Sequence, residues 1–166
     1  MPTEKKVTVR QSIRPAATGV VLAAVWLVSA LVAPAISDEV ASIKVSKGAV
    51  HIERGGQKLP APVGTRIEMA DLVVTGPDGS VGIAFVDNSL LSAGPNTVLA
   101  IEKFAFDSTT HAGSFETMLH KGTLAVVSGK IARQTPEAMK VKTPAATLGV
   151  RGTEFLVRTG AATDFR

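Results

Sequence analysis

The sequence predicts an all-β fold: a single, antiparallel-rich domain of short strands, arranged as a β-roll or a sandwich, after an N-terminal signal or anchor helix. Short runs in which apolar and polar residues alternate recur from Val40 onward, and that is the period of half-buried strands. Turn residues, drawn from 15 Gly and 9 Pro, separate these runs at short intervals without a convincing helical pattern between them. With 45% hydrophobic residues, the chain has ample material for one packed core.

The N-terminal segment has the organisation of an export signal. Residues 1–14 are basic, residues 15–37 carry no charge, and the densest apolar run extends over residues 19–32. Ala33-Pro34-Ala35 then supplies the small-x-small pattern of a signal-peptidase site, so we predict cleavage after Ala35. The alternative is a retained membrane anchor, because an uncharged run of this length approaches the ~20 residues that span a bilayer.

We therefore divide the chain into a signal peptide or membrane anchor, residues 1–35, and a β domain, residues 36–166. On either alternative the β domain lies outside the inner membrane, because basic residues stay cytoplasmic. It is predicted to be periplasmic or secreted, or anchored in the inner membrane and facing the periplasm. The first segment carries +3 of the net charge of +4, so the β domain has little basic excess and is not predicted to bind nucleic acid.

The first half of the β domain is predicted as a series of strands. Ile43 and Val45 alternate with polar residues and are expected on one face, and Gly48 ends this run. Gly55-Gly56 predicts a hairpin turn. The other predicted features are a strand at 50–53, an apolar series at Leu59, Val63, Ile67, Leu72 and Val74, a loop at 76–80, and a strand with Val81, Ile83 and Phe85 on one face.

The second half continues in the same way. It is predicted to contain a turn at 87–89, a short strand at Leu90-Leu91, a break at 94–96, a strand at 98–106, separate strands at 115–119 and 122–128, and a polar connection at 129–137. The alternation then resumes at Met139. Pro144 removes a backbone donor and ends this strand, and Gly149 and Gly152 favour a tight turn or a close backbone approach. A last strand follows, with Phe155 and Val157 on one face.

The last motif carries a family resemblance. The string Thr-Pro-Ala…Gly-Val-Arg-Gly-Thr-Glu-Phe resembles the signature of the FecR domain, a periplasmic β-rich module named for the iron-dicitrate sensor of Gram-negative bacteria. Further motifs typical of the family extend the resemblance over about residues 40–158: Gly48-Ala49-Val50, Asp71-Leu72-Val73-Val74-Thr75, Asp78-Gly79-Ser80 and Gly122-Thr123-Leu124. The signature residues that the resemblance marks as possible partner-binding positions are Thr143, Pro144, Gly149, Val150, Arg151, Gly152, Thr153, Glu154 and Phe155.

The resemblance implies a non-enzymatic protein-interaction module, a sensor or adaptor in envelope signalling with a periplasmic or membrane protein as its partner. The family's signal-transducing members carry a cytoplasmic domain before the membrane segment. Here about 18 residues precede the apolar run, so we expect a short stand-alone form without the anti-sigma domain. The alternative function is an envelope-structural or polysaccharide-binding role.

Catalytic and metal sites are not predicted. The chain has no Cys, which excludes disulfides, cysteine nucleophiles and thiolate metal sites. His51, His111 and His120 show no metal-ligand spacing, and no serine lies in a nucleophile-elbow pattern. The aspartates at turns, Asp71, Asp78, Asp87 and Asp107, are expected to hydrogen-bond nearby backbone rather than bind calcium. No cofactor is predicted, and the chain is not expected to be an enzyme.

Two groups of charged residues leave alternatives open. Arg151 either locks its turn, through backbone carbonyls or Glu154, or is displayed to recognise a partner's carboxylate. Lys140 and Lys142 share a polar strand face and are expected to protect a solvated sheet edge; with Lys130 and Arg133 they could instead form a patch for anionic envelope polymers.

The supply of aromatic side chains favours a protein partner. Stacking on sugar rings requires exposed aromatic side chains. Aromatic residues of any kind make up only 4% of this chain, and the strand pattern assigns Phe85 and Phe155 to the core.

Overall fold

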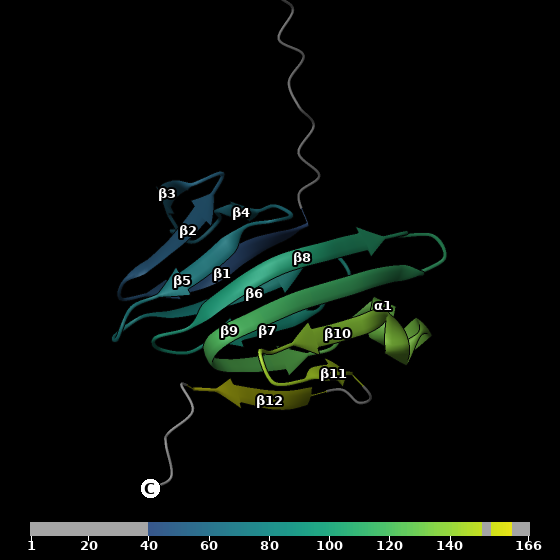
Figure 1. Cartoon of the computed structure of the whole chain (residues 1–166). Helices are drawn as coiled ribbons and strands as arrows, with labels where there is room; N and C mark the ends of the chain where they lie inside the picture. Colours follow the sequence, from purple (N-terminus) through teal and green to yellow (C-terminus); the bar gives the residue numbers. More distant parts are fainter. Residues whose placement is uncertain (1–39, 151–153, 161–166) are drawn as a thin grey trace, which may run out of the picture. The chain divides into compact units, whose positions relative to one another are not determined.

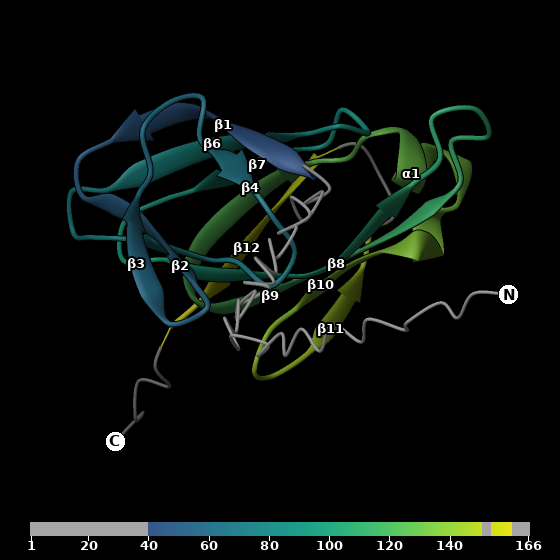
Figure 2. The ribbon, with the colours of Figure 1, turned by 90° about the horizontal axis from the view of Figure 1, so that it is seen from above.

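The computed structural model describes residues 40–150 and 154–160, and these residues form an all-β, mostly antiparallel domain (Figure 1). Its strands belong to one sheet that curls back on itself through the long strand β9 (Gly113–Val127), so that two layers face each other (Figure 2). The first half of β9 belongs to one layer and the second half to the other. The predicted all-β class is therefore confirmed.

Layer 1 contains the first half of β9 and six other strands. Its neighbouring strands are antiparallel except for β10, which runs parallel to β9. In spatial order the layer comprises β3 (Gln57–Pro60), β2 (Val50–Arg54), β5 (Leu72–Thr75), β8 (Val98–Phe106), β9, β10 (Met139–Lys142) and β11 (Thr147–Gly149).

Layer 2 contains the second half of β9 and five other strands, all antiparallel to their neighbours. In spatial order it comprises β4 (Arg66–Ile67), β1 (Ala41–Lys47), β6 (Ser80–Phe85), β7 (Leu90–Ala93), β9 and β12 (Glu154–Thr159). The C-terminal signature thus supplies an outer strand to each layer, β11 to layer 1 and β12 to layer 2.

A glycine allows β9 to pass from one layer to the other. Gly122 has φ +100°, and a Cβ at this position would clash with Thr97 Oγ1. The same hydroxyl accepts a hydrogen bond from Thr123 N at 3.1 Å. The two strands predicted at 115–119 and 122–128 are therefore one strand, because a Gly with positive φ bends the chain here without ending it.

The core lies between the layers. Phe85 of layer 2 contacts Phe104 and Phe115 of layer 1, with ring centroids 5.3 and 4.4 Å apart. Phe115 is fully buried, as are the large apolar residues of both inner faces. Burial of each such side chain stabilises the fold by about 1.5–3 kcal/mol. The fully buried members are Ile43, Ile52, Ile67, Ile83, Leu91, Leu99, Ile101, Phe115, Leu119, Leu124, Ile131 and Met139.

The predicted polar connection at 129–137 contains two short helices, so the expectation of no helix was wrong. They are α1 (Lys130–Gln134) and the 3-10 helix η1 (Pro136–Ala138). Ile131 of α1 is fully buried and contacts the first residue of β9. A five-residue helix contributes one buried side chain or two, which is too few to produce a helical period in the sequence.

The expected position of Val45 was also wrong. The pairing of β1 with β6 shifts between Ile43 and Val45, and Val45 is 45% exposed while Ile43 is buried. A β-bulge places two residues opposite one and reverses the alternation beyond it.

No helix within the described residues is long and apolar enough to cross a membrane. The predicted signal or anchor, and the boundary after Ala35, lie outside the described residues.

Candidate functional site

Two of the motifs that carry the family resemblance pack against each other. Gly48 has φ +64°, and a Cβ there would clash with the backbone carbonyl of Asp78. A Cβ at Gly79 would clash with the Ala49 carbonyl in the same way, while Ala49 N donates to Asp78 Oδ1 at 3.3 Å. The Gly-x-Val and Asp-Gly-Ser motifs are therefore halves of one tight contact between loops.

A third motif begins with an ion pair between a buried carboxylate and a half-buried guanidinium. Asp71 is fully buried, and its two carboxylate oxygens accept bonds of 2.7 Å from Arg54 Nε and Nη2. Arg54 Nη1 also donates to Glu68 Oε1 at 2.6 Å, and these carboxylates raise the pKa of the guanidinium above its usual value. The sequence predicted Asp71 only as a turn residue, because nothing in the pattern linked it to an arginine 17 positions earlier.

Two of the other predicted turn aspartates, Asp87 and Asp107, make the local bonds expected of them, whereas the Asp78 carboxylate accepts from Ala49 N, 29 positions earlier. Asp87 is buried, and its carboxylate accepts bonds from Ser89 N at 3.0 Å and Ser89 Oγ at 2.7 Å. Asp107 accepts from the backbone N–H groups of Thr109 and Thr110, which lower the pKa of its carboxyl. The Asp87 and Asp107 carboxylates therefore stabilise the loops in which they lie.

The signature segment differs from these motifs because it lies largely on the surface. After β10, Thr143 closes a turn: its N–H donates to the Ala146 carbonyl at 2.7 Å, and Ala146 N donates to Thr143 Oγ1 at 3.0 Å. The strand β10 ends at Lys142, two residues before Pro144, as predicted, and Pro144 is exposed at the tip of the turn. All three residues of β11 are exposed, including Leu148 at 38%. The sequence did not predict β11, because three residues are too few to show an alternation.

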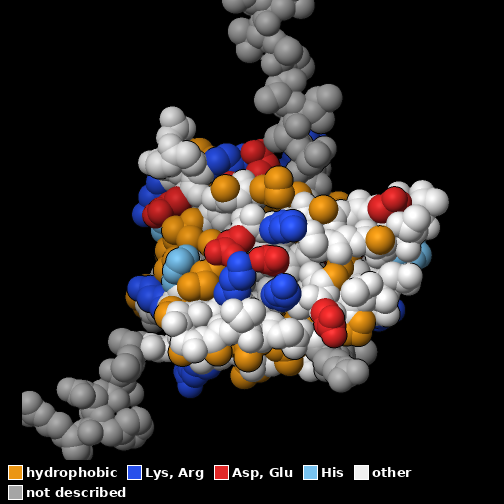
Figure 3. Space-filling view, turned by 45° about the vertical axis from the view of Figure 1, so that its right-hand side comes forward, with side chains coloured by type: hydrophobic (Ala, Val, Ile, Leu, Met, Phe, Trp, Pro, Cys, Tyr) orange, Lys and Arg blue, Asp and Glu red, His pale blue; other side chains and the backbone are white. Residues whose placement is uncertain are grey.

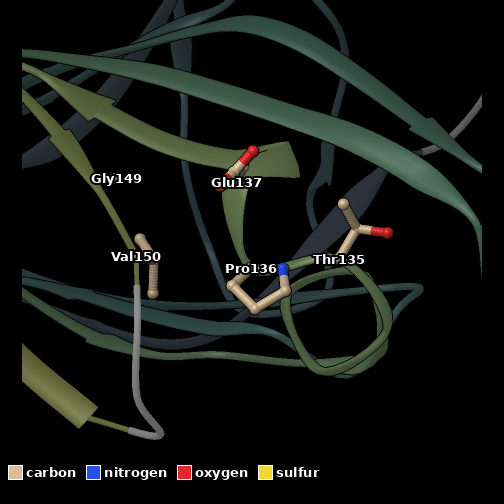
Figure 4. Close-up of a pocket in the computed structure, with 5 residues that line it drawn as sticks. All are labelled: Thr135, Pro136, Glu137, Gly149 and Val150. Atoms are coloured by element: carbon tan, nitrogen blue, oxygen red, sulfur yellow. The ribbon is translucent and has the colours of Figure 1, made fainter.

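A hollow of about 320 Å³ lies beside the exposed β10–β11 hairpin. Among the described residues, its lining comes from two segments: Thr135 and the first two residues of η1, Pro136 and Glu137, on one side, and Gly149 of β11 with the following Val150 on the other. Figure 4 shows Pro136 and Val150 on opposite sides of the hollow. A Cβ built at Gly149 meets no atom within 4 Å. Among the described residues, the close backbone approach, one of the two alternatives for Gly149, is therefore absent; the other alternative, a tight turn toward Gly152, extends into residues outside those that the structure describes.

We name this site, the hairpin at 139–150 with the hollow beside it, the signature hairpin. It brings together four of the predicted positions: Thr143, Pro144, Gly149 and Val150. Val150 is buried, and its N–H donates to the Met139 carbonyl at 3.1 Å, which fixes the chain as it leaves β11.

The remaining predicted positions lie elsewhere. Glu154 is exposed and Phe155 is half-buried at the start of β12, in layer 2. Phe155 packs against the core as expected. Arg151, Gly152 and Thr153 lie outside the described residues, so the proposed contacts of Arg151 stay predictions.

The basic residues near the hairpin do not form the edge that the sequence predicted. β10 lies between β9 and β11, and is therefore an interior strand of layer 1. Lys142 Nζ is 2.6 Å from Glu116 Oε2 and 2.9 Å from Glu102 Oε2. Hydrogen bonding and charge in this group lower the pKa of Glu116 and raise that of Lys142. On the face shown in Figure 3, acidic and basic side chains are intermixed.

The described residues offer no group of three or more side chains suited to holding a metal ion. His51 Nε2 lies 3.4 Å from Glu53 Oε1, and His111 stacks on Phe106 with centroids 6.1 Å apart. The site presents an exposed strand, an exposed leucine and a hollow that Glu137 helps to line.

A comparison with family models matches FecR protein over residues 71–164. No curated protein and no solved structure shows a significant match to the chain. The matched region contains the Asp71 motif, the bend at Gly122 and the whole signature segment. The chain therefore belongs to the FecR protein family.

Proposed function

We propose that this chain is a non-enzymatic, periplasmic protein-interaction module that acts as a sensor or adaptor in envelope signalling. Membership in a regulatory family that is typically envelope-associated supports this proposal. The observation that carries it is the exposure of one part of the signature hairpin, β11 and the turn before it. The other motifs that we described close loops or bend a strand, whereas this segment has β11 and the turn before it at the surface.

The signature hairpin suits an extended segment of a partner protein. Within the described residues, β11 pairs with β10 alone, so its other side has backbone groups available to a further strand. Strand addition gives affinity through backbone hydrogen bonds, and adjoining pockets give specificity for side chains. The hollow beside Gly149 supplies such a pocket, and Leu148 supplies an apolar contact.

Binding to an anionic polymer has less support on this face. Lys142, one of the four basic residues that favoured it, is held between two glutamates. Three of the phenylalanines are also unavailable for stacking on sugar rings, because Phe85, Phe104 and Phe115 are buried in the core.

The test is affinity capture from envelope extracts with the tagged full chain as bait. We expect a specific protein that remains bound through a wash with polysaccharide and moderate salt. Gly149→Phe should abolish this capture, because Gly149 lines the hollow and places the added ring beside the binding surface, at a position where a Cβ meets no described atom within 4 Å. Gln57→Phe, which adds the same ring to an exposed position on β3 at the far edge of layer 1, is the matched control and should retain capture.

Capture of glycan alone, released by salt, would contradict the proposal and favour the polysaccharide-binding alternative. Equal capture by wild type and Gly149→Phe would move the binding surface away from the signature hairpin.

A further inference from the structure

The outer strand of layer 2 has features that the proposed function leaves unexplained. Within the described residues, β12 pairs with β9 alone, in continuous register from Glu154 opposite Val127 to Thr159 opposite Gly122. The strand contains no proline and no bulge, which are usual devices against edge-to-edge pairing. Its outward side chains include Leu156, which at 68% exposure exceeds the other exposed large apolar residues of the described chain.

The outer face beside Leu156 carries a row of small residues. Across the sheet, Leu156 stands opposite Ala125, which in turn pairs with Ser92 of β7. Ser92 pairs with Gly82 of β6, and Gly82 pairs with Val45 of β1. Val45 is 45% exposed, so an apolar side chain lies at each end of a row of small residues. Leu90, in the adjacent row, is 46% exposed.

The charges on β12 are complementary to those of a second copy of the same strand. Glu154 and Arg158 are exposed, and they lie at equal distances on either side of Leu156. If two β12 strands pair antiparallel about a two-fold axis at Leu156, each Glu154 stands opposite the Arg158 of the other copy. The two Leu156 side chains then meet at the axis. Opposite charges and apolar pairs at directly facing positions stabilise a sheet by about 0.2–1 kcal/mol each.

We propose that the chain forms a symmetric homodimer through antiparallel pairing of β12 with β12 of a second copy, centred on Leu156. Pairing satisfies the open backbone edge and joins the two layer 2 sheets into one continuous sheet. An isologous contact of this kind closes after two copies, so it yields a dimer and no filament. The proposal is independent of the signature hairpin, because β11 belongs to layer 1.

The natural absence of Cys makes the axis directly measurable by disulfide trapping. In an antiparallel pair, directly facing Cα atoms lie about 4.5–5.5 Å apart, within the range of about 4.4–6.8 Å that a disulfide requires. Leu156→Cys in the full chain should therefore form a covalent dimer under mild oxidation. Glu154→Cys should not cross-link to itself, because the two copies of residue 154 are separated by roughly 13 Å along the strands. A mixture of Glu154→Cys and Arg158→Cys chains should form a mixed dimer.

Ser92→Cys, an exposed position on β7, is the background control. We expect Leu156→Cys to cross-link about tenfold faster or more, because pairing raises the local thiol concentration. Association through residues 1–35 would raise the cross-linking rate of all single-cysteine variants alike, and that result would contradict the proposal. Equal rates at Leu156 and Ser92 would also overturn it.

A charge exchange gives a second test, which does not depend on a covalent cross-link. Arg158→Glu should weaken self-association of the full chain in light scattering, because it places like charges opposite each other. Glu154→Arg combined with Arg158→Glu should restore it. If the single and double variants both associate as wild type does, the proposed register is wrong.

Discussion

Glycines in the family motifs differ in what they do for the structure. Gly122 has a positive φ and stands against Thr97, so its lack of a side chain is required for the bend in β9. Gly149 has open space around it, so its lack of a side chain shapes the surface hollow. The sequence alone shows two glycines near strands and cannot separate these roles, because backbone angle and neighbouring atoms both depend on distant segments.

Substitution by alanine should separate the two glycines. Gly122→Ala is expected to lower the free energy of unfolding by about 1–3 kcal/mol, because a residue with a Cβ is strained at positive φ. Gly149→Ala should leave it within about 0.5 kcal/mol of wild type. Urea unfolding followed by circular dichroism measures both. Similar losses for the two variants would show that the bend does not depend on Gly122.

The Arg54–Asp71 pair gives a second prediction for single residues. Arg54→Met leaves the fully buried Asp71 carboxylate without its counter-charge, which should cost about 3–5 kcal/mol. Arg54→Lys should recover only part of the loss, since an ammonium cannot make the two parallel bonds of the guanidinium. Thermal unfolding at neutral pH tests this series, and a stable Arg54→Met variant would refute it.

At the scale of the element, the alternation in the sequence predicted strands well where each strand kept one register. β6, β8 and β10 lie at the positions expected for them. The predictions failed where tertiary contacts changed the local pattern, at the bulge in β1 and at α1. The β10–β11 hairpin was half predicted, because Pro144 marked the end of β10 but three exposed residues gave no sign of β11.

The helix α1 buries two side chains, Ile131 and the smaller Ala132, and Ile131 is the larger contribution. Ile131 is fully buried, so Ile131→Ala should lower the free energy of unfolding by about 2–5 kcal/mol. Because α1 leads into the turn with Thr135 and Pro136, the same variant should also weaken partner capture at the signature hairpin. Arg133→Ala, an exposed change in the same helix, is the control and should alter neither measurement.

The charged group on β8, β9 and β10 predicts a pH dependence. Because the pKa of Glu116 is lowered in the folded state, its contribution to the free energy of unfolding is present above the ordinary glutamate pKa. That contribution is lost as pH falls through the folded-state pKa. Because the pKa of Lys142 is raised in the folded state, its contribution to the free energy of unfolding is present below the ordinary lysine pKa. That contribution is lost as pH rises through the folded-state pKa. The difference in stability between wild type and Lys142→Met should therefore be greatest near neutral pH.

Melting temperatures over a pH series, compared with the exposed-lysine control Lys58→Met, measure this difference. It should decline in acid and with added salt, because the group is solvent-accessible. A difference that is constant from acid to alkaline pH would exclude the ion pairs as its source.

At the scale of the whole molecule, the C-terminal signature supplies an outer strand to each of the two layers. The segment provides β10 and β11 to layer 1, and β12 to layer 2. The sequence predicted the class of fold and the importance of this segment, partly through its resemblance to the FecR family. It could not predict that the segment divides between two layers, since that depends on the bend in β9 and on which strands stand beside it. The result is a domain with two separate edges formed by one motif.

The central claim is that the signature hairpin binds another protein, and photo-crosslinking tests it most directly. A photoreactive residue replaces Leu148 on β11 in the full chain, and a matched one replaces Gln57 on β3, before irradiation of intact cells. We expect a discrete adduct with a different protein from position 148 and none from position 57. The absence of a protein adduct at 148, or the same adduct at both positions, would contradict the account.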